Sequence, residues 1–308
     1  LSPDLPFEPP PDESAEVASR RVRNFFENLL PEGQALDDAA RAHGVSKSNP
    51  VGLLAALGRE TAGSLRIAGG STAAQPSDAR REIAPEELSQ RIRERANQPF
   101  SVWDGKVRLS IAGYQDKVAV FIDRGHWFLV EGPTLASTHI LKPQPARAAL
   151  ADLPYNEFAC MRLAKAVGLP AAEVELAHVP EPVLVVKRFD RRPQGAGIER
   201  LHLVDGCQAL GLPVGHKYER PYGSTGDAAK VRAGASLAAL FRLTATFAAP
   251  LPAALALLRW TIFQVLVGNT DAHAKNLSFF CGPEGLSLAP AYDIVCALVY
   301  ARQFDQTL

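Results

Sequence analysis

Two carboxylates and one amide near the end of the chain could meet at one point. Asp271 and Asn276 lie in the segment GNTDAHAKN (268–276), and Asp293 follows later in the chain. Between them, two short apolar runs flank a turn at residues 281–285, which predicts a β-hairpin. The start of one hairpin strand lies beside the end of the other, so Asn276 and Asp293 are expected to converge near Asp271. Oxygen ligands of this kind suit Mg²⁺.

Phosphoryl transfer would use such a group of side chains. It needs a divalent metal ion, a base for the attacking hydroxyl and a cation that holds the phosphates. An aspartate and an asparagine separated by four residues also occur in the catalytic loop of protein kinases. We therefore predict that Asp271 is the catalytic base and that Asn276 and Asp293 bind Mg²⁺. The alternative is an ordinary turn, since the spacing alone is common.

His273 and Lys275 lie inside the same segment. Each could contact a phosphate of the nucleotide, orient the loop, or make a structural hydrogen bond. The sequence leaves these alternatives open.

A nucleotide-binding part is expected earlier in the chain. The turn SIAGYQDK (110–117) lies between two predicted strands, and backbone N–H groups around Ser110, Ala112 and Gly113 could cover phosphates. It contains one glycine and does not match the G-x-G-x-x-G pattern. Lys142 ends the strand at 138–141, where it could reach the α- and β-phosphates or simply be solvated.

Two further residues are candidates for nucleotide binding. Glu157 is expected in the first turn of the next helix and could form an ion pair with Lys142. A glutamate there would equally suit the helix dipole. Phe189 ends the segment 185–189, which could pack against adenine, or it could belong to the core.

The elements that would carry these residues suggest an α+β fold. Helices are predicted at 14–30, 35–42, 50–57, 85–96 and 155–167, and strands at 106–111, 117–122, 127–130, 138–141, 174–179 and 183–186. Residues 191–198 are expected to be a polar link, followed by mostly helix up to residue 267. We therefore predict an N-terminal α+β lobe at 1–190 with the nucleotide-binding strands, and a mainly helical C-terminal lobe at 191–308 with the catalytic loop.

Composition excludes several classes. The 308 residues carry 33 basic and 33 acidic side chains, which disfavours a generally basic nucleic-acid-binding protein. The longest uncharged apolar stretch, 243–258, contains Pro250 and Pro252, so no membrane span is expected. The four cysteines form no CxxC pair, and no secretory signal is evident. A cytoplasmic protein is expected.

Taken together, these segments resemble the HipA family of bacterial serine/threonine kinases, the toxins of HipA–HipB toxin–antitoxin pairs. The resemblance spans nearly the whole chain. The segments that carry it, in chain order, are NFFENLLP (24–31), SIAGYQDK (110–117), THILK (138–142), NE (156–157), RFDR (188–191), KYE (217–219), GNTDAHAKN (268–276) and YD (292–293).

The resemblance implies a two-lobed protein-kinase-like fold with a helical C-terminal lobe. It implies that Asp271 is the catalytic base, that Asn276 and Asp293 bind Mg²⁺, that Lys142 binds ATP and that Ser110 is autophosphorylated. It further implies a toxin associated with persistence, whose substrate is a glutamyl-tRNA synthetase. The implied partner is a HipB-like helix-turn-helix antitoxin that carries the complex to operator DNA.

Two departures from the family qualify these expectations. The chain is expected to be incomplete, because it lacks a small β-rich N-terminal portion and ends soon after Asp293. A hinge position that is acidic in relatives is Lys187 here. Two other functions stay open: a small-molecule kinase on the same scaffold, and an inactive binding module that acts as a co-repressor.

Overall fold

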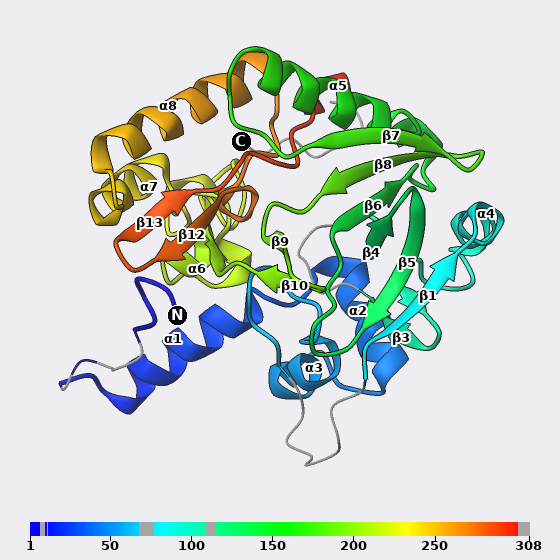
Figure 1. Ribbon diagram of the computed structural model, residues 1–308. Coiled ribbons are helices and arrows are strands. Elements are labelled where there is room, and N and C mark those ends of the chain that lie inside the picture. Colours follow the sequence, from blue (N-terminus) through cyan, green and yellow to red (C-terminus); the bar gives the residue numbers. More distant parts are fainter. Residues whose placement is uncertain (7–9, 11, 68–76, 109–114, 301–308) are drawn as a thin grey trace. The chain divides into compact units, whose positions relative to one another are not determined.

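The structure is a computed structural model that describes residues 1–6, 10, 12–67, 77–108 and 115–300 (Figure 1). The chain folds into two compact units. The first, here called the sheet unit, comprises residues 29–159 and 172–201. The second, called the hairpin unit, comprises residues 1–28, 160–171 and the chain from residue 202 onwards. Each unit is discontinuous in sequence, whereas the sequence pattern suggested one break after residue 190.

A six-stranded antiparallel sheet forms the centre of the sheet unit, with strand order β1-β5-β4-β6-β8-β7 (Figure 1). The strands are β1 (Ala79–Ile83), β4 (Val118–Asp123), β5 (His126–Glu131), β6 (His139–Pro143), β7 (Val174–His178) and β8 (Pro182–Lys187). Valine, isoleucine and aromatic residues favour these strands, with the exception of β1. The five strands predicted from residue 117 to residue 186 are confirmed; β1 was not predicted, because its residues are mostly charged.

The link between β4 and β5 is a two-residue hairpin turn. Asp123 pairs with His126, so that Arg124 and Gly125 alone make the turn. Both have positive φ angles, 49° and 83°. Two left-handed residues match the twist of the flanking strands, which fixes the register of this hairpin.

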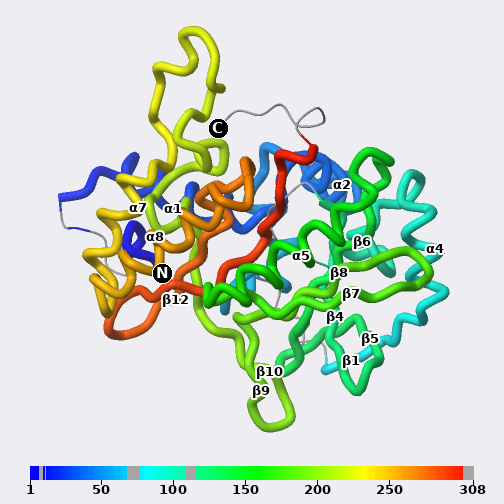
Figure 2. The backbone as a smooth tube through the Cα atoms, turned by 90° about the horizontal axis from the view of Figure 1, so that it is seen from above, coloured from blue at the N-terminus to red at the C-terminus, as the bar shows by residue number. Residues whose placement is uncertain are grey.

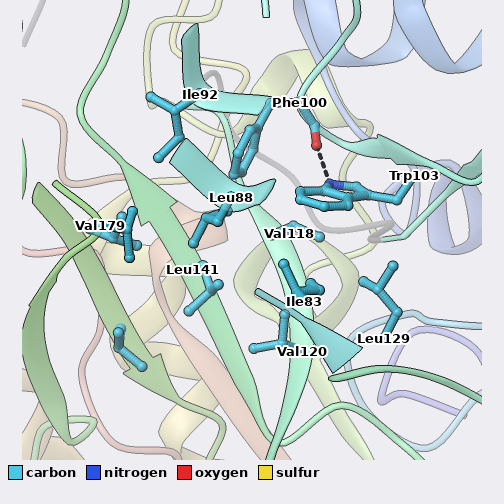
Figure 3. Packing of buried hydrophobic residues seen from close by; sticks show 12 residues of the cluster. Ile83, Leu88, Ile92, Phe100, Trp103, Val118, Val120, Leu129, Leu141 and Val179 are labelled. Carbon is cyan, nitrogen blue, oxygen red and sulfur yellow. Dashed lines mark hydrogen bonds between the residues drawn. The ribbon is translucent and has the colours of Figure 1, made fainter. Parts of the chain in front are cut away.

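The core of the sheet unit lies between the sheet and α4 (Pro85–Glu94), as Figure 3 shows. Leu88 and Ile92 of α4 are buried against sheet residues such as Val118 and Leu141. The indole N–H of Trp103 donates a hydrogen bond of 2.6 Å to the carbonyl of Phe100, so the buried ring leaves no unpaired donor. The helix predicted at 85–96 is confirmed as α4, and one of its faces supplies core residues although most of its residues are polar.

The remaining elements of the sheet unit surround this core. They are α2 (Gly33–His43), α3 (Pro50–Leu57), β2 (Val102–Trp103), β3 (Lys106–Val107), β9 (Arg191–Gln194), β10 (Gly197–Arg200) and the first part of α5 (Leu153–Ala166). The polar link predicted at 191–198 is instead the β9–β10 hairpin. Gly195 has a φ angle of 58° and supplies the turn of this hairpin. The hairpin's polar, glycine- and proline-containing composition had suggested a linker.

A buried charge network lies where β8 continues into β9. The Arg188 guanidinium contacts Asp190 at 2.8 Å and Glu60 at 3.0 Å, and Arg191 contacts the same two carboxylates. The side chains of Arg188 and Arg191 are 2% and 1% exposed. Since a buried charge is tolerated only when it is paired and hydrogen-bonded, this network fixes the chain after α3 against the end of β8.

The hairpin unit combines helices with a three-stranded antiparallel sheet of order β11-β12-β13. Its helices are α1 (Ala15–Glu27), α6 (Gly206–Ala209), α7 (Leu237–Leu243), α8 (Pro250–Val267) and the last part of α5, and its strands are β11 (Leu203–Asp205), β12 (Ser278–Gly282) and β13 (Gly285–Leu288). The predicted hairpin after residue 276 is confirmed as β12–β13 (Figure 1).

The expectation of mostly helix from residue 198 to residue 267 is wrong for residues 210–236. Figure 2 shows this segment as an extended yellow-green excursion, which contains only short 3₁₀ turns. Its glycines and prolines, such as Gly211, Pro213 and Gly226, interrupt helical hydrogen bonding.

The apolar helix α8 begins at Pro250, so both prolines that were expected to interrupt it lie in its first turn, where proline is tolerated. In the described part of the chain, α8 is the helix whose length and composition would suffice to cross a membrane, and 28% of it is buried. Length and composition are the only observations that favour a span.

The charge network predicts a pH dependence of stability. Burial opposes ionisation of Asp190, but Arg188 and Arg191 outweigh it and lower the pKa of this carboxyl to about 2. The unfolded pKa is about 3.9, so the ionised form stabilises the folded state fully above about pH 4, and this contribution, about 2 kcal/mol, is lost as pH falls toward 2.

We expect Asp190→Asn to lower the free energy of unfolding by about 3 to 5 kcal/mol at pH 7, because Arg188 loses a buried partner. The difference from the parent should narrow between pH 4 and pH 2. Urea unfolding followed by circular dichroism measures both effects. Asp227→Asn, whose side chain is 96% exposed, is the control. An equal effect of both variants at pH 7 would contradict the role of the network.

Candidate active site

The predicted catalytic loop starts at a fixed helix end. The helix α8 ends at Val267, and Gly268 takes the left-handed conformation that terminates it, with a φ angle of 69°. The Asn269 side chain donates to the side-chain oxygen of Gln264 at 2.7 Å and accepts from the backbone N–H of Asp271 at 3.2 Å. The chain therefore leaves the helix in a defined direction toward Asp271.

Asp271 and Asn276 lie together at the two ends of this loop. The Asn276 side-chain amide donates to the backbone carbonyl of Asp271 at 3.2 Å. Asp271 is exposed, whereas Asn276 is buried. An exposed carboxylate can meet an external hydroxyl, and a buried amide can keep the loop closed beside it.

Asp293 is brought to the same loop by its neighbours. The Tyr292 hydroxyl donates to the carbonyl of Lys275 at 2.7 Å, and the Ala291 N–H donates to the carbonyl of Pro170 at 2.8 Å. Asp293 itself has a φ angle of 58°, which is uncommon for a residue with a side chain. The backbone strain indicates that the surroundings hold this carboxylate where it is.

Lys275 has a structural position. Its ammonium group is 1% exposed and donates to the Asn28 carbonyl at 2.9 Å, the Asn28 side-chain oxygen at 2.8 Å and the Asp205 carboxylate at 2.6 Å. An ammonium has three protons to donate, and three protein oxygens accept them. Of the alternatives that the sequence left open, the geometry favours orientation of the loop over contact with phosphate.

His273 is a neutral side chain in this environment. Burial lowers the pKa of its imidazole to about 3; the Lys217 ammonium acts in the same direction and Asp293 acts against it. A neutral ring cannot offer a full positive charge to a phosphate at physiological pH.

Tyr218, to which the sequence pattern gave no role, contacts the predicted base. The Tyr218 hydroxyl donates a hydrogen bond of 2.5 Å to Oδ1 of Asp271, and its ring meets the edge of His273 with centroids 5.1 Å apart. The only sequence feature that pointed to Tyr218 was its place in the segment KYE, one of the segments that resemble the HipA family. Asn28 and Asp205 were likewise unassigned, although Asn28 lies in the segment NFFENLLP.

The ion pair predicted between Lys142 and Glu157 is present in the sheet unit. Lys142 Nζ lies 2.6 Å from Glu157 Oε1, and both residues are buried. Glu157 sits in the second turn of α5 rather than the first, so the helix dipole contributes less to its position than the lysine does. Val118 pairs with Leu141 in antiparallel register. The residue before Val118, at the end of the turn that precedes β4, therefore lies next to Lys142.

Four other residues were predicted to bind the nucleotide. Three of them, Ser110, Ala112 and Gly113, lie outside the described residues. The fourth, Phe189, is half-buried directly after β8, between the buried Arg188 and Asp190. Lys187 at the end of β8 is exposed and pairs with Glu173 at 3.0 Å.

The donor set of the loop fits Mg²⁺ better than a transition metal. Within the residues that the structure describes, no three His, Cys, Asp or Glu side chains are grouped to hold a metal ion. Mg²⁺ often takes only one or two protein carboxylates, with water and phosphate oxygens completing its shell. One carboxylate from Asp293 and one amide oxygen from Asn276 are sufficient for such an ion.

Comparisons with known proteins show the family to which the chain belongs. Residues 1–68 match the HipA N-terminal domain, and residues 109–308 match the HipA-like C-terminal domain. The whole chain is 40% identical to the serine/threonine-protein kinase toxin HipA of Shewanella oneidensis, covering 69% of that protein. A putative kinase of Sinorhizobium fredii, Y4mE, is 36% identical over 96% of the chain and 69% of its own length.

A solved structure of a HipA complex is also similar to this chain. The Shewanella oneidensis HipA, HipB and operator DNA complex matches with a TM-score of 0.86 and 40% identity, over all of this chain and 70% of the HipA-like chain compared. These matches define a protein of the serine/threonine-kinase class with a mixed helix-and-sheet fold. The chain belongs to the HipA family.

The position of Lys275 predicts a large effect on stability. Lys275→Met leaves the Asp205 carboxylate without its buried cation, so the free energy of unfolding should fall by about 3 to 5 kcal/mol. Thermal unfolding followed by circular dichroism measures this. Lys165→Met, at an exposed position of α5, is the control and should change stability by less than about 0.5 kcal/mol. A Lys275→Met protein as stable as the control would show that the ammonium does not anchor the loop.

Proposed function

We propose that this chain transfers the γ-phosphoryl group of ATP to a serine or threonine hydroxyl of a protein, with Mg²⁺ as cofactor. The observation that carries the proposal is the loop of a HipA-family chain. The Asn276 amide donates to the backbone carbonyl of exposed Asp271. The hydroxyl of Tyr292, the neighbour of Asp293, donates to the carbonyl of Lys275. The spacing of Asp271 and Asn276 matches that of kinase catalytic loops.

Asp271 acts as the base in this proposal. The acceptor hydroxyl oxygen forms a bond to the γ-phosphorus, the bond from that phosphorus to the bridging oxygen of ADP breaks, and the hydroxyl proton passes to the Asp271 carboxylate. Exposure of Asp271 lets a protein side chain approach it. Asn276 and Asp293 would hold Mg²⁺, which neutralises phosphate charge when bound.

The sheet unit would hold ATP. Lys142 is a buried cation kept in place by Glu157, an arrangement suited to the α- and β-phosphates. Ser110, Ala112 and Gly113 would cover the phosphates through backbone N–H groups, and Phe189 would pack against adenine. The proposed fold is that of a two-lobed kinase, with the nucleotide-binding strands in one lobe and a mainly helical second lobe.

The biological setting follows from the family. We propose a cytoplasmic toxin that works with a HipB-like helix-turn-helix antitoxin on operator DNA, because the similar Shewanella oneidensis HipA forms a complex with HipB and its operator DNA. A glutamyl-tRNA synthetase is the proposed substrate. Ser110 is the proposed autophosphorylation site, where about −1.5 to −2 added charges would repel the phosphates of ATP.

Replacement of the base tests the proposal directly. Asp271→Asn keeps an oxygen that accepts from Tyr218 but cannot take a proton, so phosphoryl transfer should fall about 10²- to 10⁴-fold while the fold is retained. Intact-mass spectrometry after incubation with Mg-ATP measures autophosphorylation, and labelled ATP with purified glutamyl-tRNA synthetase measures transfer. Asp227→Asn is the control. Transfer by Asp271→Asn at the rate of the parent would disprove the assigned role; transfer only to small molecules would favour a small-molecule kinase.

The buried ion pair gives a second test. Lys142→Met should raise the KM for ATP by about tenfold or more, since a charge-assisted hydrogen bond to phosphate is lost. The variant also leaves Glu157 buried without its cation, so Lys142→Met/Glu157→Met is made in parallel to restore stability without restoring ATP binding. Lys47→Met, on the surface of the sheet unit, is the control. Recovery of the parent KM in the double variant would argue against a nucleotide-binding role for Lys142.

A further inference from the structure

Tyr218 contacts the catalytic loop but has no role in the function proposed above. Its hydroxyl lies 2.5 Å from Oδ1 of Asp271, and the two residues are far apart in sequence. Tyr218 belongs to the irregular segment 210–236, which the sequence predicted to be helix. The contact therefore depends on how this segment folds back onto the loop.

We propose that Tyr218 is a positioning residue that holds the Asp271 carboxylate in the orientation needed to accept the proton of the substrate hydroxyl. The inference rests on the proposed function and deepens it, because it assigns a second residue to the same reaction step. The acting group is the phenolic O–H, since the ring alone cannot restrain a carboxylate.

The backbone on either side of Tyr218 is anchored. The carbonyl of Lys217 accepts from the N–H of Ala274 at 3.0 Å, which ties the segment to the catalytic loop itself. The Lys217 side chain is buried, and its ammonium lies 5.6 Å from the centroid of the Tyr218 ring. The ring also meets His273 edge-on. These contacts hold the Tyr218 ring in place, so its hydroxyl keeps a constant position next to Asp271.

The irregular chain after Tyr218 folds back, so that residues 234 and 235 lie beside residues 216–219. The N–H of Gly234 donates to the carbonyl of Glu219 at 3.1 Å, and the N–H of Ala235 donates to the carbonyl of His216 at 2.9 Å. A Cβ at position 234 would lie 1.8 Å from the carbonyl oxygen of Tyr218. Only glycine allows this approach, so Gly234 sets the position of the Tyr218 backbone.

The need for such a restraint follows from the exposure of Asp271. An exposed carboxylate samples several side-chain rotamers, and only some of them place an oxygen within hydrogen-bond reach of the acceptor hydroxyl. A bond to one oxygen restricts this freedom. Orientation of reacting groups lowers the barrier without changing the affinity for ATP.

The test compares Tyr218→Phe with the parent and with Tyr222→Phe, a variant of a tyrosine on the same segment whose side chain is 63% exposed. Phenylalanine keeps the ring contact with His273 and removes only the hydroxyl. We expect kcat for phosphoryl transfer to fall about ten- to a hundredfold, with the KM for ATP and the melting temperature unchanged. Tyr222→Phe should match the parent.

Several outcomes would overturn the inference. These are an unchanged kcat in Tyr218→Phe, an increased KM for ATP without a change in kcat, or an equal relative loss when the substitution is added to Asp271→Asn. The last would mean that Tyr218 acts independently of the base. If Asp271→Asn is inactive and Tyr218→Phe is fully active, only this inference fails; if Asp271→Asn is fully active, the proposed function fails first.

A second variant moves Tyr218 without altering its hydroxyl. Gly234→Ala forces the backbone of Tyr218 away from its position, so kcat should again fall while the KM for ATP stays constant. Gly215→Ala, where a Cβ would meet nothing within 4 Å, is the matched control. Equal kcat values for the two alanine variants would contradict the proposed restraint.

Discussion

The loop at residues 268–276, the proposed catalytic loop, depends on one buried ammonium group. The Lys275 side chain carries its charge into the interior of the hairpin unit, where desolvation of an ammonium costs several kcal/mol unless it is fully hydrogen-bonded. The oxygens that satisfy it come from Asn28, after α1, and from Asp205, at the end of β11. The carbonyl of Lys275 also receives the Tyr292 hydroxyl. One residue thus joins the end of the N-terminal helix and a strand through its ammonium group, and the residue before Asp293 through its backbone carbonyl.

The sheet unit uses the same principle twice. Lys142 and Glu157 form a buried pair, and Arg188, Asp190, Arg191 and Glu60 form a buried network. Such groups are poor contributors to net stability compared with apolar packing, but each of them tolerates few alternative arrangements. Apolar contacts between α4 and the sheet hold this unit together (Figure 3). The buried charges then decide where individual side chains lie.

The sequence was informative where a pattern is local. Alternating β-branched residues predicted five strands of the central sheet, and the turn at residues 281–285 predicted the β12–β13 hairpin. Spacing and hairpin geometry predicted that Asp271, Asn276 and Asp293 come together, and their catalytic and metal-binding roles stay predictions. Residues whose roles depend on distant partners were missed: Tyr218 reaches Asp271, and Asn28 reaches Lys275, across long stretches of sequence. The charged strand β1 and the β9–β10 hairpin were missed because their composition resembles that of loops.

The central claim is that Asn276 and Asp293 hold a divalent cation that binds the phosphates of ATP beside Asp271. The most direct measurement is a crystal structure of the protein with Mn²⁺ and a non-hydrolysable ATP analogue, in which anomalous scattering locates the metal. The claim predicts a Mn²⁺ peak bonded to the Asn276 amide oxygen, an Asp293 carboxylate oxygen and phosphate oxygens of the analogue. A metal–nucleotide complex bound elsewhere, with neither side chain as a ligand, would contradict it.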